Sequence, residues 1–315
     1  MSTSAVPPAP APSAPPSVPS STPPSEPRPT PPAASAAPAG NPLWRWLRGD
    51  LRASLSLGFL LLLLLLSIAA PVIAPYSPTA QDINNTLADP GPEHLLGTDD
   101  LGRDVLSRLI HGAPATLYAS FLAVGIAILL GVPVGLLAGY LGGWVDDAIS
   151  RVIDALLSFP AIVLAIAVTG ALGIGLTNGM ISVGIVFSPQ LARLVRARTL
   201  VVRQELYVDA ARCFGAGVGR ILWRHVLPNT VQPVIVQVTL LLAAALLAEA
   251  SLSFLGLGIQ APGASWGAML ARAYQNMEIA PGQMYPPGLA ILLTALAFNT
   301  LGESLRAALD PTMKT

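Results

Sequence analysis

Side chains that commonly catalyse reactions or bind metals are sparse in this 315-residue sequence. His94 and His111 are too isolated from other ligand types to suggest a metal site, so we expect them in surface loops. Cys213 is the only cysteine, which excludes an intrachain disulfide and favours a small apolar helix residue. The only lysine, Lys314, does not end a phosphate-binding loop of the form G-x-x-x-x-G-K-[ST]. We therefore expect no catalytic residue, no metal and no bound cofactor.

Glu249 is a carboxylate at the end of a long apolar stretch, residues 230–248. An ionisable group in a membrane segment often marks a transport pathway, but this one can also bond Ser251 or Ser253 in a purely structural role. Both interpretations stay open. An intramembrane hydrolase would need a nucleophile and a base within apolar segments. No histidine falls in the spans predicted below, so we do not expect an enzyme.

Residues 207–229 form the stretch around which the rest of the chain is organised. Leu206, Ala210 and Phe214 recur at helical spacing, and Asp209 falls in the first turn, where a carboxylate stabilises the helix dipole. Gly215 can adopt the positive φ that ends a helix. A second amphipathic helix is predicted over 218–226, with Pro228 as its end.

Arginines crowd this stretch and the residues before it: Arg193, Arg196, Arg198, Arg203, Arg212, Arg220 and Arg224. Two short amphipathic helices with a basic rim do not belong in hydrocarbon, yet they lie between two apolar segments. Such a structured loop between membrane spans, here residues 203–229, is typical of a docking element.

The composition is that of a membrane protein, with 53% hydrophobic and 11% charged residues against about 25% charge in soluble domains. The net charge of zero gives no indication of a nucleic-acid partner. Of seventeen Lys and Arg residues, only Arg103, Arg108 and Arg272 fall outside under the topology that follows. We predict an all-α protein with six spans and both termini in the cytoplasm: residues 53–74, 113–145, 155–172, 180–195, 230–248 and a sixth through 288–302.

Within the second predicted span, Ala or Gly recurs at every fourth position from Ala115 to Gly143, a pattern that lets helices approach closely in lipid. In the outer segment 252–287, Trp266 and Tyr285 are predicted membrane-interface anchors. Residues 1–42 are mostly Pro, Ala, Ser and Thr, and we expect a disordered tail. The remainder divides into a first span with an outer loop, 43–112, and a transmembrane domain, 113–315.

Several strings resemble one family. Asp209-Ala210-Ala211, Gly215 and Leu227-Pro228 are similar to the EAA loop of permease subunits in ATP-binding-cassette importers. The strings 96–104, 224–229, 249–258, 265–267 and 288–311 resemble the C-type subunit of dipeptide and oligopeptide permeases. Three features depart from the family pattern: Asp209 stands where Glu is usual, the tail is long, and 280–283 lacks an aromatic residue.

The resemblance implies a type I importer permease in a prokaryotic inner membrane, with its coupling loop between the fourth and fifth spans. It implies a pair with a second homologous permease, two ATPase subunits that bind ATP, and an extracytoplasmic solute-binding protein. The implied coupling residues are Tyr207, Asp209, Ala210, Ala211, Phe214, Gly215, Leu227 and Pro228. The implied substrates are di- and oligopeptides. Nickel chelates, glutathione and sugars remain alternatives, as does a membrane scaffold that transports nothing.

Overall fold

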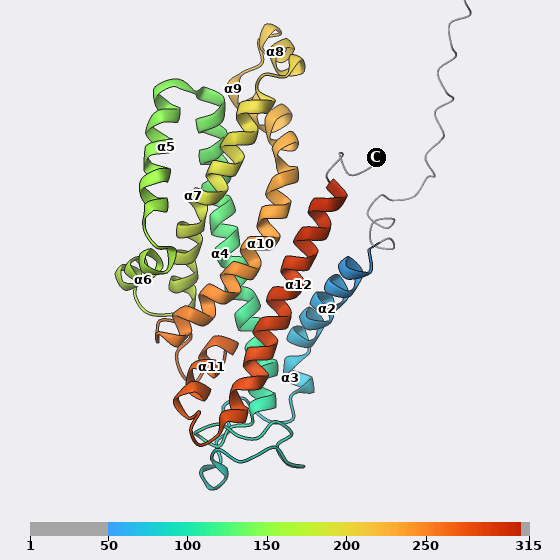
Figure 1. The fold of residues 1–315 in the computed structure, drawn as a ribbon, viewed down its shortest axis with the longest axis vertical. Helices are drawn as coiled ribbons and strands as arrows, with labels where there is room; N and C mark the ends of the chain where they lie inside the picture. Colours follow the sequence, from blue (N-terminus) through green and yellow to red (C-terminus); the bar gives the residue numbers. More distant parts are fainter. Residues whose placement is uncertain (1–49, 310–315) are drawn as a thin grey trace, which may run out of the picture. The chain divides into compact units, whose positions relative to one another are not determined.

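The computed structural model describes residues 50–309, and these residues are almost entirely helical (Figure 1). Within them the only extended pairing is an isolated bridge between Thr98 and Asp104. The predicted tail 1–42 lies outside the described residues. The long helices are α2 (Leu51–Ile68), α4 (Val105–Leu141), α5 (Gly143–Ser158), α6 (Ala161–Leu172), α7 (Leu176–Val202), α10 (Leu227–Phe254) and α12 (Tyr285–Leu309). The short elements are α3 (Ala70–Ile73), η1 (Ile83–Asn85), α8 (Leu206–Cys213), α9 (Val218–Ile221), η2 (Leu222–Val226), α11 (Trp266–Gln275) and η3 (Pro281–Met284).

Helices α4 and α7 form the most extensive helix pair of the bundle. Gly131, Gly135 and Gly139 lie where a Cβ would come within 2.7, 2.5 and 2.6 Å of Ser188 O, Ala192 O and Thr199 Cβ on α7, respectively. In the same way, a Cβ on Gly184 of α7 would meet the Ala123 carbonyl of α4 at 2.6 Å. The small residues from Ala119 to Gly139 are thus the contact face, as predicted from their four-residue spacing.

Helix α10 packs against this pair and against α12, and α12 packs in turn against α2 (Figure 1). Two apolar clusters fill the interior. One is centred on α4, α7, α10 and α12 and includes Leu246 and Trp266. The other lies near the α8 end of the bundle and includes Leu191, Val195, Val208 and Val226.

Four helical segments among the described residues are long and apolar enough to span a membrane: Leu51–Ile68, Val105–Leu141, Val218–Phe254 and Pro281–Leu309. The pair α5 and α6 adds a fifth if it is taken as one bent span. Helix α7 has 27 residues and is long enough to span a membrane. It carries polar groups such as Gln190 and Arg193, and it is less apolar than the four segments above. The fourth span of the sequence prediction, residues 180–195, therefore rests on the length of α7 and its place between α6 and α8.

The third span predicted at 155–172 does not form one continuous helix, because the chain bends by 97° between α5 and α6. The bend falls at Phe159, whose φ of −83° and ψ of 141° are extended. A residue before proline is driven into that conformation, so Pro160 explains the break. Asp146, Asp147 and Arg151, which fall between the second and third predicted spans, are part of α5.

The second span begins earlier than predicted, at Val105, because the Asp104 carboxylate accepts a hydrogen bond from the Ser107 amide (2.7 Å) and caps the helix. His111 consequently lies in the second turn of α4 and not in a surface loop as predicted. The first span also differs: α2 ends at Ile68, and Pro71 lies in the first turn of the separate helix α3.

Pro228 does not end a helix as predicted. Helix α9 continues through the π-helical turn η2 into α10, which gives one run from Val218 to Phe254. Proline is tolerated in the first turn of α10, and the wider π turn before it accommodates the missing amide donor.

Trp266 is not at the membrane interface, contrary to the prediction. It is 2% exposed, and its indole Nε1–H donates to the Leu109 carbonyl at 2.9 Å.

Candidate functional site

Helix α8 projects at one end of the bundle (Figure 1). Its Val208 side chain anchors it there. Val208 is fully buried and belongs to the apolar cluster that also contains Leu136 of α4 and Val195 of α7. A fully buried valine stabilises its position by about 1.5–3 kcal/mol relative to an exposed one. The Val208 side chain therefore attaches α8 to helices α4 and α7, in addition to the covalent connections at the two ends of α8.

Arg212 makes a second attachment between α8 and α4. Its Nε–H donates to the Tyr140 hydroxyl at 3.2 Å, and its guanidinium lies 5.1 Å from the centre of the Tyr140 ring. Its Nη1 also donates to Asp209 Oδ1 at 3.0 Å. The hydrogen bond with Tyr140 and, to a lesser extent, Asp209 raise the pKa of Arg212, so this guanidinium stays charged. Asp209, in the first turn of α8, thus interacts favourably with the helix dipole and also accepts the hydrogen bond from Arg212.

Helix α8 ends in a Schellman motif at Gly215. The Gly215 amide donates to Arg212 O (2.9 Å), and the Ala216 amide donates to Ala211 O (3.0 Å). Gly215 has a φ of 75°, the left-handed conformation that the sequence predicted. Gly217 has a φ of −65° and begins α9, so only one of the two glycines is needed for the turn.

Large apolar side chains of this segment are exposed. Phe214 is 91% exposed, Leu206 86% and Trp223 71%. Beside them lies a hollow of about 460 Å³ lined by Tyr207, Ala210, Ala211, Phe214, Gly215, Ala216, Arg220, Arg224 and His225. Such side chains on a polar end of a membrane protein indicate a surface that another protein covers.

The structure brings together most of the predicted coupling residues, but not all of them. Tyr207, Ala210, Ala211, Phe214 and Gly215 line the hollow. Leu227 and Pro228 lie apart from it, at the start of α10, and Leu227 packs against the apolar cluster around Val208. Both residues lie in the first turn of α10, where Leu227 is partly buried and Pro228 is exposed.

Glu249 is 1% exposed, near the end of α10. Its Oε1 accepts hydrogen bonds from Ser253 Oγ (2.7 Å) and Ser265 Oγ (2.8 Å). Ser251, the alternative partner, bonds the Leu247 carbonyl instead. Ser265 in turn caps α11 by accepting from the Ala268 amide at 3.2 Å. Glu249 thereby fixes the start of α11 against α10. Its pathway role stays a prediction.

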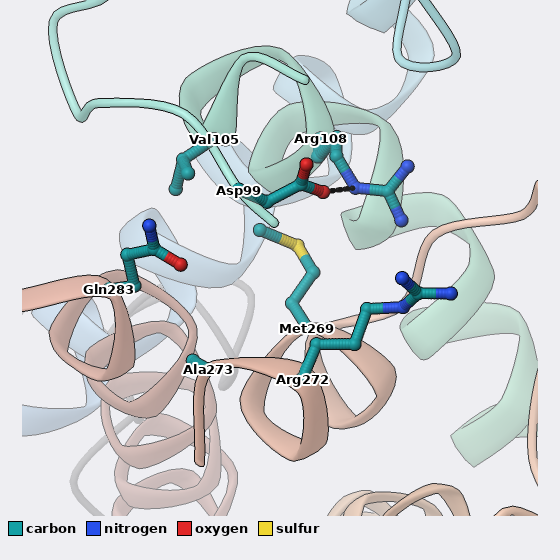
Figure 2. Close-up of a pocket in the computed structure, with 7 residues that line it drawn as sticks. All are labelled: Asp99, Val105, Arg108, Met269, Arg272, Ala273 and Gln283. Carbon is teal, nitrogen blue, oxygen red and sulfur yellow. Dashed lines mark ion pairs between the residues drawn. The ribbon is translucent and has the colours of Figure 1, made fainter. Parts of the chain in front are cut away.

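A cluster of charges near the start of α4 escaped the sequence analysis (Figure 2). Arg103 and Arg108 are each 2% exposed and both reach Asp99, with Nη2 of Arg103 at 2.6 Å and Nε of Arg108 at 3.5 Å from Oδ2. Arg272 of α11 pairs with Asp100 at 3.2 Å. The cavity among these side chains measures about 20 Å³, the size of a single water molecule. The cluster therefore ties α11 to the loop before α4 and leaves no room for a solute.

Comparison with known proteins identifies the chain. Residues 131–315 match the family described as "Binding-protein-dependent transport system inner membrane component", and residues 43–90 match the "N-terminal TM domain of oligopeptide transport permease C". The dipeptide transport system permease protein DppC of Alkalihalophilus pseudofirmus is 42% identical over 79% of this chain and 82% of its own. The glutathione transport system permease protein GsiD of Escherichia coli O6:K15:H31 is 46% identical over 86% of this chain and 90% of its own.

A solved structure supports the fold. The inward-facing MetNI methionine ABC transporter contains a chain that aligns with 64% of this one and 96% of its own length, with a TM-score of 0.51 and 19% sequence identity. Since the first family alone covers more than half of the sequence, membership is settled by sequence, and the structure agrees with it. The chain is no enzyme but a multi-pass inner-membrane permease subunit of an ABC importer, and it belongs to the binding-protein-dependent inner-membrane component family, in its peptide and nickel branch.

Proposed function

We propose that this permease subunit moves short peptides, which a binding protein delivers and ATP hydrolysis on a separate subunit drives through the membrane. The two relatives at 42% and 46% identity are a dipeptide and a glutathione permease, and glutathione is itself a tripeptide. Both coverages exceed three quarters of each chain, so the likeness includes the transmembrane helices as well as the loops. Nickel chelates and sugars are the competing substrate classes.

The observation that carries the coupling role is the exposed surface of α8. Phe214 at 91% exposure and Leu206 at 86% project beside the hollow, and they are the kind of apolar anchors that fill a cleft on a partner. Arg220 and Arg224 at the rim of the hollow supply charges for an acidic partner surface. We assign this surface as the docking site of the ATPase subunit. ATP would bind to that subunit and not to this chain.

The assembly that fits this assignment contains a second homologous permease and two ATPases, with α8 and both chain termini on the cytoplasmic side. The arginine distribution supports that orientation, because positive charge concentrates in the α7 to α9 region. A movement of the ATPase would shift α8, and the attachments through Val208 and Arg212 would carry the shift to α4 and α7.

Uptake measurements test the proposal directly. A strain that lacks this chain should lose uptake of radiolabelled di- and tripeptides, and a plasmid copy should restore it. Mass spectrometry of the ligand on the co-purified binding protein should identify peptides. Uptake of a nickel chelate or a sugar in place of peptides would overturn the substrate class, and unchanged uptake of all of them would indicate a scaffold.

A further inference from the structure

A groove of about 490 Å³ lies between the last part of α4 and the first part of α10, and it continues onto η2. Its floor is made of three buried side chains, Leu136, Leu222 and Val234. Its edges include the exposed side chains of Leu129 and Trp223. Apart from Trp223, every residue that lines the groove is aliphatic. The groove is therefore an apolar channel between two helical segments that are each long and apolar enough to span a membrane.

The dimensions of the groove fit an extended acyl chain. Along α4 it extends from Ile128 to Leu137, which is nine residues or about 14 Å of helix. That length is close to half of a hydrocarbon layer about 30 Å thick, the part that one lipid leaflet fills. A partner helix about 10 Å across would need about twice the observed volume over this length. A helix can therefore rest on the groove but cannot enter it, whereas a single hydrocarbon chain can.

Two exposed tryptophans mark the end of the groove that lies nearest to α8. Trp223 is 71% exposed at its edge, and Trp144 is 79% exposed at the start of α5, just after α4 ends. Tryptophan is enriched where the hydrocarbon of a membrane meets the headgroups. A hydrocarbon layer of about 30 Å centred on α4 would end near Pro133, about ten residues beyond the middle of the helix. Both observations place the groove across this boundary, with Ile128 on the hydrocarbon side and Trp223 among the headgroups.

Two arginines flank Trp223 in the chain. Arg220 and Arg224 are exposed, and within residues 50–309 neither forms an ion pair. Both lie within one helical turn of Trp223, about 5.4 Å along the axis. At the other end of the groove α4 offers no cation, because residues 113–141 carry no charge. Arginine donates paired hydrogen bonds to phosphate, so the groove has a site for an anionic headgroup at its Trp223 end alone.

We propose that this groove binds an anionic phospholipid of the surrounding bilayer, with one acyl chain between α4 and α10 and the phosphate on Arg220 and Arg224. Exposed basic side chains beside a membrane attract anionic lipids, and the aliphatic walls select a hydrocarbon chain. The inference does not depend on which solute is transported. The groove shares no lining residue with the hollow assigned to the ATPase. Arg220 and Arg224 line that hollow, so the lipid and the ATPase would meet at these two side chains.

Photolabelling of the assembled complex in phosphatidylcholine nanodiscs tests the site. A small fraction of the lipid is replaced by phosphatidylglycerol or, in a parallel sample, phosphatidylcholine that carries a diazirine in one acyl chain. Peptides that contain groove residues should be labelled about tenfold or more strongly by the anionic probe, because two arginines beside the headgroup raise its affinity by at least that factor. The exposed Leu292 of α12, away from the groove, should be labelled equally by both probes. Equal labelling of the groove by the two probes, or cross-links from the groove to the second permease in place of lipid, would overturn the proposal.

A variant that fills the groove tests where the chain lies. Val231 lines the groove and is partly buried, so Val231→Trp should lower labelling by the anionic probe about tenfold or more. Leu247→Trp is the matched control, because Leu247 is exposed about four turns further along α10 and does not line the groove. Unchanged labelling of the groove peptides with Val231→Trp would contradict the position of the chain. The comparison of the two probes on the wild-type complex stands even if this variant does not assemble.

A double variant tests the headgroup site. Arg220→Gln with Arg224→Gln should abolish the preference for phosphatidylglycerol and leave the two probes within about twofold of each other. Arg198→Gln removes an exposed arginine of α7 that lines neither the groove nor the hollow, and it should keep the preference. Labelling is measured whether or not the ATPase stays bound, so an effect on docking does not obscure the result. A preference that persists in the double variant would overturn the assignment of the phosphate to these arginines.

Discussion

Replacing Gly215 with valine would strain the turn after α8 without creating a collision. The φ of Gly215 is 75°, and a Cβ added there would meet no atom within 4 Å. The left-handed conformation costs an L-residue about 1–2 kcal/mol, and a β-branched residue is especially disfavoured there. The expected effect is therefore one of backbone energy alone, confined to a segment at the end of the bundle.

The size of the effect follows from that strain. Val208 and Arg212 hold α8 to the transmembrane helices, so we expect the variant to insert and to pair with the second permease. The turn relieves its strain by leaving the Schellman geometry, which moves Phe214 and the hollow beside it. A penalty of about 1–2 kcal/mol against the docked arrangement corresponds to about 5–30-fold weaker binding of the ATPase.

The assay is the affinity of purified ATPase for the permease pair in nanodiscs, followed by stimulated ATPase activity and uptake. Gly217→Val is the matched control, because Gly217 has a φ of −65° and the same open space around its Cβ. Affinity and coupled transport should fall together for Gly215→Val and stay normal for Gly217→Val. Equal affinities for the two variants, or normal coupled transport with Gly215→Val, would refute the assignment of α8 as the coupling element.

Further predictions concern other parts of the chain. Asp209→Ala should weaken ATPase binding more mildly, by at most about fivefold, through the lost dipole contact; a loss as large as that of Gly215→Val would contradict this reasoning. A membrane-impermeant maleimide should label Cys213, which is exposed, in inside-out vesicles stripped of ATPase and not in intact spheroplasts; outside labelling would reverse the topology. Gly135→Leu should destabilise the bundle by about 1–3 kcal/mol or more, seen as a lower Tm, because its Cβ would meet Ala192 O at 2.5 Å, whereas Gly125→Ala, with open space, should not. Glu249→Gln should keep assembly and uptake, because the amide oxygen can still accept from Ser253 and Ser265; lost uptake with normal stimulated ATPase activity would instead place Glu249 on the pathway.

Much of the helical architecture could be predicted from local residue patterns. The four-residue spacing of Ala and Gly in α4 identified the face that packs on α7, since only small residues allow such an approach. The break at Phe159 was missed because residues 155–172 contain no charge, and hydropathy alone does not detect a bend. Pro160 was the available signal, through the conformation that it imposes on the preceding residue. Pro228 was predicted to end a helix but lies in the first turn of α10, because proline is compatible with the first turn of a helix.

The candidate site was predictable where one local segment encodes it, as in the Schellman turn at Gly215. Contacts between distant segments were not. Asp154 and Arg193 are 39 residues apart, and Arg108 reaches Asp99 only once the loop before α4 has folded back. The partner of Arg193 on α5 could not be inferred from spacing.

The contacts described above and those that follow form a continuous chain of packed and bonded side chains from α8 to α5. Val208 and Arg212 attach α8 to α4, and Arg203 Nη1 of the α7 end donates to the Gly139 carbonyl of α4 at 3.0 Å. Helices α4 and α7 approach closely at Gly131, Gly135 and Gly139, so that no side chain separates their backbones there. Helix α5 is joined to α7 through the pairs of Asp146 with Arg196 and Asp154 with Arg193. The second pair is exposed, whereas the first is largely buried. A displacement of α8 therefore reaches α5 through a largely buried contact near its start and an exposed one about two turns further along the helix.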